Sequence, residues 1–414
     1  MAHHLVIQLA RFGDVVQTKR LLLSLAANPD DTVHLAVDVS LVPLARQIYP
    51  FAVVHALPAH RGGNAVGDVL LQAREAFAAL AAIPFDSVYN LNFSGMSLAL
   101  AGLFDPDAVR GYLRRNGQVL RSRWLRMAFR WIGNRHIAPL NLVDLWAYLH
   151  PSPVAPDLVN PAAAVKASGK IAVAASGREA RRSLPPEVLA PVLEAIFAAD
   201  QGPEIVLLGG NAERPFARKL ARLLRPATVQ RLNDLCGQTS LADLPDILSG
   251  CGKVLTPDTG IMHLAAHCGV PVQAFFLSSA WCFETGPYGA GHTVYQAVRE
   301  CAPCVESRPC PFDTACLSPF ASGDFAKSVA GREPRALPEG LVLFHSDCDA
   351  FGCDYLPCEG VLPEMKQRGE LRALLAEYVG RAEERPDVGR FADAVFHETD
   401  WMLPPEGAGL DVSG

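Results

Sequence analysis

The sequence predicts an α/β protein in which two parallel sheets, one in each half of the chain, are covered by helices. Short apolar runs alternate with longer helical patterns through residues 1–150 and again through residues 170–330. That alternation is typical of a Rossmann-like unit. A stretch rich in proline and small residues, 151–169, separates the two units and predicts a linker.

Short apolar runs bounded by polar or small residues predict the strands, and apolar residues at helical spacing predict the helices. In the first half, the expected strands are LVIQLA (5–10), TVHLAVD (32–38) and SVYNLNF (87–93), and the expected helices are KRLLLSLAA (19–27) and VGDVLLQAREAFAALAAI (66–83). In the second half, the expected strands are KIAVAAS (170–176), EIVLLGG (204–210), KVLT (253–256) and PVQAFF (271–276), with a helix in PPEVLAPVLEAIFAAD (185–200).

The chain changes character beyond about Gly331, where acids outnumber basic residues and prolines are frequent. One further helix is expected there, at residues 363–379. We therefore assign 331–414 to an acidic C-terminal extension that packs on the body or contacts a partner.

Composition places the chain among globular proteins. With 414 residues, 50% hydrophobic and 19% charged, it is long enough for two domains and an appendage. No apolar run approaches the roughly 18 residues that span a bilayer, and the N-terminus lacks a basic leader with a long apolar region. We expect a cytoplasmic protein.

Both halves contain a strand that runs directly into a small-residue turn and a helix. The clearer case is TPDTGIMHLAAHCGVPV (256–272), and the other is RFGDVVQT (11–18). This order directs free backbone N–H groups and a helix N-terminus toward one point, which favours a phosphate. An ordinary strand-to-helix connection is the alternative. Neither junction has a Walker-type or G-x-G-x-x-G motif, which disfavours simple NTPases and dinucleotide dehydrogenases.

Arginine is concentrated in residues 110–135, which contain no acid although the net charge of the chain is -6. Trp124, Phe129 and Trp131 are interleaved with these arginines. The combination suits an anionic lipid headgroup or an acidic saccharide at a membrane surface. Nucleic acid is disfavoured because the rest of the chain is acidic. The alternative is a solvated helix whose arginines pair with acids elsewhere. The arginines are Arg110, Arg114, Arg115, Arg121, Arg123, Arg126, Arg130 and Arg135.

Four of the eleven cysteines, Cys301, Cys304, Cys310 and Cys316, have the spacing C-x2-C-x5-C-x5-C. A zinc ion or an iron–sulfur cluster is one interpretation, although the second half is looser than in usual zinc ribbons. Reduced packing cysteines or local disulfides are the alternative, and we favour a chain without a metal site.

Several segments between about residues 5 and 320 resemble glycosyltransferase family nine, the ADP-heptose:lipopolysaccharide heptosyltransferase type, which has the GT-B fold. The extension is not covered by this resemblance. The segments that carry it are RFGDVVQTKRLLLSL, SGREARRSLPPEVL, LLGGNAERPFA, DTGIMHLAAHCGVPV and TGPYGAGH.

The resemblance implies two Rossmann-like domains with parallel sheets facing across a cleft, and inverting transfer of a sugar from a nucleoside diphosphate without a metal ion or other cofactor. The acceptor would be a hydroxyl of a lipid-linked saccharide at the inner face of the cytoplasmic membrane. Asp14 matches the family's proposed general base, and an N-terminal helix cap is its structural alternative. The acceptor side would further comprise Gly13, Asn92, Ser94, Arg114 and Arg115.

The donor side implied by the resemblance lies in the second half. Arg182, or the adjacent Arg181, would balance charge on the leaving diphosphate, and Asp258 would hold the turn or contact the donor. Glu213 would bind the ribose. The remaining expected donor contacts are Ser176, Gly177, Gly209, Gly210, Thr259, Gly260 and His263.

Two other classes stay open at this point. A nucleotide-sugar epimerase of the same architecture would need no acceptor, and a non-catalytic nucleotide-sugar-binding protein would need no general base. The sugar, the nucleotide, the acceptor and the oligomeric state are not specified by these motifs.

Overall fold

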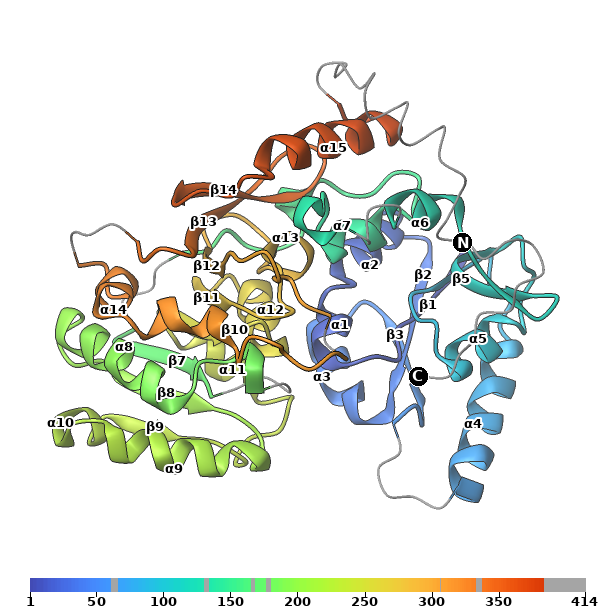
Figure 1. The fold of residues 1–414 in the computed structure, drawn as a ribbon. Helices are drawn as coiled ribbons and strands as arrows, with labels where there is room; N and C mark the ends of the chain where they lie inside the picture. The colour runs from blue at the N-terminus through green and yellow to red at the C-terminus, as the bar shows by residue number, and fades with distance from the viewer. Residues whose placement is uncertain are drawn as a thin grey trace. The chain divides into compact units, whose positions relative to one another are not determined.

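A computed structural model describes residues 1–60, 66–129, 134–164, 168–175, 180–305, 307–332 and 337–382 (Figure 1). They separate into two compact units. The first contains Met1–Asn134, Leu142–Val154 and the described residues from Glu370 on, and the second contains Arg135–Asn141 and Ala155–Gly369. The chain therefore changes unit at 135, 142, 155 and 370. The change at 155 lies within the expected linker 151–169, whereas the other three were not expected.

The first unit has a six-stranded sheet in the order β3-β2-β1-β4-β5-β6. All neighbouring strands are parallel except β5 and β6, which form an antiparallel hairpin. The strands are β1 (His3–Ile7), β2 (Thr32–Asp38), β3 (Val53–Leu57), β4 (Ser87–Asn90), β5 (Val109–Arg115) and β6 (Gln118–Arg121).

Helices of the first unit follow the strands, and their apolar residues pack with Leu5, Ile7 and Val88 in the core. The helices are α1 (Phe12–Val16), α2 (Lys19–Leu25), α3 (Val42–Ile48), α4 (Val66–Ala81), α5 (Gly95–Ala101), α6 (Arg123–Ala128) and α7 (Leu142–Ala147), with 3-10 turn η1 (Val39–Leu41).

The second unit has an eight-stranded sheet in the order β14-β13-β12-β11-β10-β7-β8-β9. Strands from β12 to β9 in that order are parallel, and β13 and β14 are antiparallel additions at one edge. The strands are β7 (Lys170–Ala174), β8 (Glu204–Leu208), β9 (Leu232–Asp234), β10 (Lys253–Pro257), β11 (Val272–Phe276), β12 (Thr293–Ala297), β13 (Leu341–Cys348) and β14 (Cys353–Glu359).

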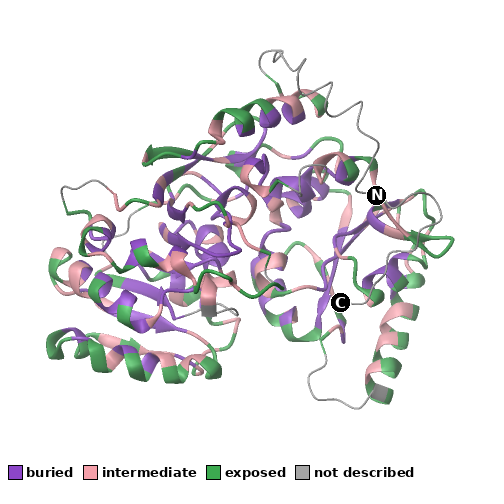
Figure 2. Cartoon of the chain, viewed as in Figure 1, coloured by how far each residue is buried: buried purple, intermediate pink, exposed green. Residues whose placement is uncertain are grey.

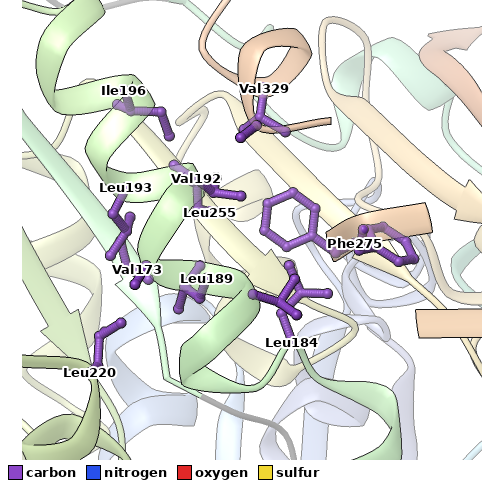
Figure 3. Close-up of a cluster of buried hydrophobic side chains, with 14 of the residues drawn as sticks. Val173, Leu184, Leu189, Val192, Leu193, Ile196, Leu220, Leu255, Phe275 and Val329 are labelled. Carbon is purple, nitrogen blue, oxygen red and sulfur yellow. The ribbon is translucent and has the colours of Figure 1, made fainter. Parts of the chain in front are cut away.

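The core of the second unit lies between this sheet and helix α8, whose Leu189, Val192 and Leu193 face Val173 of β7 and Phe275 of β11 (Figure 3). The helices are α8 (Pro186–Ala199), α9 (Arg214–Leu223), α10 (Pro226–Val229), α11 (Leu244–Ser249), α12 (Gly260–His267), α13 (Cys282–Thr285), α14 (Gly323–Val329) and α15 (Met365–Tyr378). The 3-10 turns are η2 (Arg135–Ile137), η3 (Pro156–Leu158), η4 (Ala180–Arg182), η5 (Asn211–Glu213) and η6 (Ala315–Ala321).

The α/β class with two parallel-dominated sheets is confirmed, and every strand and helix expected above is present within a few residues. The extension packs on the body, one of the two possibilities considered above, because residues 341–359 add two strands to the second sheet, which were not expected. The chain then passes from the second unit to the first within α15. Residues 383–414 lie outside the described residues.

The arginine-rich segment is also different from the helix considered above. It forms the β5–β6 hairpin and the short helix α6. Asn116 and Gly117 form the turn with φ of 51° and 81°, the left-handed pair that two-residue hairpins favour. The Asn-Gly pair was a sequence signal for this hairpin.

Strands of both sheets are largely buried, whereas α4 and α9 carry many exposed residues (Figure 2). Among the helices that the structure describes, none is both long enough and apolar enough to cross a bilayer.

Candidate functional site

The strand order of the second unit has a switch point between β7 and β10. From β7 the chain adds β8 and β9 on one side, and it then returns to add β10, β11 and β12 on the other side. In open parallel sheets, ligands bind beyond the carboxyl ends of the strands at such a point. The loop after β7 carries Arg182, and the turn after β10 carries Asp258.

Asp258 is the centre of a polar cluster at this switch point. The residue is buried, and its carboxylate accepts hydrogen bonds from Arg182 Nη2 and from Thr285 Oγ1, the latter at 3.0 Å. His263 Nε2 lies 3.9 Å from the other carboxylate oxygen. Burial raises the pKa of Asp258, whereas the Arg182 guanidinium, the Thr285 hydroxyl and Arg135 act to lower it.

Helix α12 begins beside this cluster. Thr259 precedes it in extended conformation, and its side chain forms no capping hydrogen bond. The hydroxyl of Thr259 instead lies 2.9 Å from that of Thr256. The N–H groups at the start of α12, from Gly260 on, are therefore oriented to bind an anion, as expected for a phosphate site.

The two adjacent arginines have different partners. Arg181 donates to the backbone carbonyl of Arg308 at 2.6 Å and to that of Val305 at 3.4 Å. Arg182 pairs with Asp258. Of the two, Arg182 is therefore the one in the cluster. Ser176 and Gly177, also expected here, lie outside the described residues.

Arg135 is a member of the cluster that the sequence did not place there. By sequence it ends the arginine-rich segment of the first half, but it belongs to the second unit. Its guanidinium binds the carboxylate of Glu284 and donates to the carbonyls of Ser279 and Cys304 at 2.9 and 3.0 Å. These bonds connect the loop after β11 to the four-cysteine segment, next to Asp258.

The expected ribose-binding loop follows β8, on the other side of β7. Glu213 accepts a hydrogen bond from the backbone N–H of Gly210 at 2.7 Å, so its carboxylate caps the turn η5. A Cβ at Gly209 would lie 2.8 Å from the Cβ of Glu213, so a glycine is required there by the protein itself. Gly209 and Gly210 thus both lie against the side chain of Glu213.

The first unit has the same arrangement at its own switch point, between β1 and β4. Asp14 is the third residue of α1, and its carboxylate accepts from the backbone N–H of Arg11 at 3.0 Å. The capping role considered for Asp14 is thus present, although Asp14 is the third residue of the helix and Arg11 is its N-cap. Gly13 precedes Asp14 in the same turn.

Asn92 and Ser94 follow β4. Asn92 accepts from the backbone N–H of Leu9 at 2.6 Å and donates to Gln8 at 2.7 Å, so it lies against the turn that leads to Asp14. Ser94 is the N-cap of α5, where its hydroxyl accepts from the backbone N–H of Ser97. The structure brings Asn92 to the Asp14 turn and gives Ser94 a local structural role.

Arg114 and Arg115 are exposed at the tip of the β5–β6 hairpin. Among the described residues, neither they nor Arg121, Arg123 and Arg126 form an ion pair with an acid. The expected pairing with acids is found for Arg135.

Aromatic side chains in and near this segment differ in exposure. Phe129 is half-buried, with the guanidinium of Arg121 over its ring. Phe93, on the loop after β4, is 73% exposed beside the ring of Tyr112. Trp124 is instead buried and donates to the carbonyl of Leu145 at 2.8 Å, which corrects its expected place at a surface. Arg130 and Trp131 lie outside the described residues.

All eleven cysteines are free thiols, so the local disulfides considered above are not formed. Within the described ranges, no group of three or more His, Cys, Asp or Glu side chains is arranged to hold a metal ion. Cys304 and Cys316 nevertheless lie in a common environment, since burial and the neighbouring thiols raise the pKa of each.

Comparisons with known proteins match part of the second unit to one family. Residues 170–315 match the family model described as glycosyltransferase family 9 (heptosyltransferase). Lipopolysaccharide heptosyltransferase 1 of Pseudomonas aeruginosa is 35% identical over 98 residues, which are 24% of this chain and 26% of that protein. A second relative, lipooligosaccharide heptosyltransferase 2 of Haemophilus influenzae, is matched over only 22% of its own length, so the chain matches about a quarter of either protein.

Solved structures extend the likeness to both units. E. coli ADP-heptose lipopolysaccharide heptosyltransferase II has a TM-score of 0.55 at 16% identity, covering 80% of this chain and 98% of that one. A second E. coli heptosyltransferase, solved with ADP, has a TM-score of 0.53 at 19% identity, covering 72% and 93%. At these identities the likeness establishes the shared fold, which is the expected GT-B architecture.

Proposed function

From the glycosyltransferase family 9 domain that residues 170–315 contain, we propose that this chain is an inverting glycosyltransferase that uses a nucleotide sugar. The observation that carries the proposal is the cluster of Arg182, Asp258 and the uncapped start of α12 at the switch point of the second sheet. The family match alone names a class, whereas this cluster supplies the groups that the chemistry needs.

The leaving group of such a transfer is a nucleoside diphosphate, whose negative charge grows as the glycosidic bond breaks. Oriented N–H donors and a fixed cation lower the energy of that charge. The first turn of α12 and Arg182 are such groups, and they act without a metal ion or other cofactor. ADP and heptose are the proposed nucleotide and sugar, because the relatives are heptosyltransferases and one was solved with ADP.

The first unit would bind the acceptor. Asp14 lies at the carboxyl edge of its sheet and is the proposed general base, which takes the proton of the acceptor hydroxyl as its oxygen attacks the anomeric carbon. Its carboxylate oxygen Oδ2 accepts the hydrogen bond from the backbone N–H of Arg11. Attack from the face opposite the diphosphate gives inversion.

The acceptor is proposed to be a lipid-linked saccharide of the lipopolysaccharide core, reached at the inner face of the cytoplasmic membrane. The exposed Arg114 and Arg115, which lack acidic partners among the described residues, and the exposed ring of Phe93 support this proposal. Each arginine near an anionic bilayer surface contributes about 1 kcal/mol.

Sedimentation with phosphatidylglycerol vesicles tests the membrane part. The double variant Arg114→Ala/Arg115→Ala should bind them more weakly than the wild type, whereas Arg218→Ala/Arg222→Ala, which removes two exposed arginines of α9, should not. Equal binding by all three proteins, or binding that does not weaken with salt, would remove the arginine hairpin from the proposal.

A thermal-shift panel of ADP, UDP, GDP and their sugars tests the donor part. A ligand at 100 times its Kd stabilises the folded state by about 2.7 kcal/mol. Stabilisation by ADP and transfer of heptose to a core saccharide are the expected results. No shift with any nucleotide would reject the function, and epimerisation of a nucleotide sugar without an acceptor would favour the epimerase.

A further inference from the structure

The residue that shares Asp258 with Arg182 is Thr285, the last residue of the one-turn helix α13. Neither Thr285 nor anything that supports α13 was among the expected site residues. One side of α13 faces the Asp258 cluster, and the other side is held by residues beyond position 315, where the family match ends.

Tyr355 of β14 supports the turn that follows α13. Its side chain is 0% exposed, and its hydroxyl donates to the carbonyl of Pro287 at 3.1 Å. Asn141 Nδ2 donates to that same hydroxyl and to the carbonyl of Gly286, both at 3.2 Å. A Cβ at Gly286 would lie 2.3 Å from the Tyr355 hydroxyl, so the tyrosine packs directly against the backbone.

Phe283 anchors α13 to the same part of the extension. Its ring packs edge-on against Tyr355 and Phe344, with centroids 5.9 and 5.3 Å apart. The guanidinium of Arg368, in α15, lies 3.7 Å from the ring centroid, and it is bound by the carboxylate of Asp354. Strong cation–π contacts of this kind occur where the cation is desolvated.

The two remaining polar side chains of α13 reach the other side. Glu284 binds the guanidinium of Arg135. Thr285 donates from its hydroxyl to Oδ2 of Asp258. Helix α13 therefore connects the hairpin β13–β14 mechanically to the carboxylate at the switch point.

We infer that Thr285 is a positioning residue for Asp258 during donor binding, and that Tyr355 of the extension holds Thr285 in place. The inference rests on the proposed function. Arg182 and Thr285 share one carboxylate oxygen of Asp258. When the diphosphate draws Arg182 away, the Thr285 hydrogen bond keeps the buried carboxylate satisfied and oriented, so that the cation moves to the ligand at a lower cost.

Three variants test the inference by calorimetric titration with ADP. Thr285→Val removes the hydroxyl at nearly constant volume and should raise the Kd for ADP by about 10- to 150-fold, the range for a hydrogen bond to a charged group. Thr285→Ser keeps the hydroxyl and should restore binding to within about threefold. Tyr355→Phe should weaken binding by about 2- to 10-fold, the range for a neutral hydrogen bond.

Matched controls exist in the same unit. Thr228→Val changes a buried threonine whose hydroxyl has no partner among the described residues. Tyr295→Phe removes the hydroxyl of a buried tyrosine in β12, which forms a hydrogen bond with Ser328 of α14. Both should bind ADP like the wild type, and thermal melts confirm that each variant is folded.

Coupling between the two changes separates positioning from general damage. The double variant Thr285→Val/Tyr355→Phe should bind no worse than Thr285→Val alone, because both changes act through one hydrogen bond.

The outcomes are distinguishable. Wild-type protein that binds no nucleoside diphosphate overturns the proposed function and this inference with it. Wild-type binding together with unchanged binding by Thr285→Val overturns the inference alone. An equal loss in Thr285→Ser and Thr285→Val would overturn it by showing that volume and not the hydroxyl matters, and additive losses in the double variant would remove Tyr355 from the mechanism.

Discussion

The buried ion pair between Arg20 and Asp144 should be the largest single polar contribution to the first unit. Both side chains are 0% exposed, and Arg20 Nη1 lies 2.5 Å from Asp144 Oδ1. Arg20 also donates to the carbonyl of Val154 at 2.9 Å and lies over the ring of Tyr148. The pair joins α2 to α7 and so holds residues 142–154 in the first unit.

Asp144→Ala should therefore destabilise the first unit by about 3–5 kcal/mol, because the guanidinium stays buried after its counter-charge is lost. For a unit of this size, 1 kcal/mol corresponds to roughly 2–4 °C in Tm, so the first unit should melt about 6–20 °C lower. Scanning calorimetry is the appropriate assay, since it resolves units that unfold separately. The exposed Asp107→Ala serves as a control and should change stability by less than about 0.5 kcal/mol.

The double variant Arg20→Met/Asp144→Leu completes the test. It removes both charges and replaces them with apolar volume, so it should recover most of the stability lost in Asp144→Ala. A shift of less than about 2 °C for Asp144→Ala would refute the reasoning that the buried charge is costly. A double variant as unstable as the single one would show that packing, and not the unpaired charge, dominates.

Two further predictions concern chemistry and pH. Asp14→Asn should lower transfer by about 10²–10⁴-fold while the ADP-induced thermal shift is retained; loss of both would make Asp14 structural. Burial, with His55 and His3 nearby, lowers the pKa of His34 to about 4, so the unfolded chain binds a proton below about pH 6.5 that the folded chain refuses until about pH 4. The free energy of unfolding should therefore decrease as the pH is lowered from about 6.5 to about 4, and it should decrease less in His34→Gln. Urea unfolding at several pH values measures this, and the same pH dependence in both proteins would contradict it.

Much of the fold was predictable because strand and helix signals are local. Apolar runs such as 32–38 and 204–210 are short, rich in branched residues and bounded by polar ones, and they form β2 and β8. Strand β14 was missed because its sequence CDYLPCE contains a proline and two cysteines and has no clean alternation. Its place at the sheet edge depends on pairing with β13, which no local pattern encodes.

The candidate site was likewise predictable only in part. The strand-turn-helix junctions that carry Asp14 and Asp258 could be predicted from the sequence, because free N–H groups at a helix start follow from local chain order. Which side chains meet at these junctions depends on the folded chain. Arg135 reaches Glu284 across 149 residues of sequence, and Tyr355 supports the turn beside Thr285 from a strand of the extension. Such contacts depend on sheet order and register, which are set when the whole core packs, and therefore they are not written in any single segment.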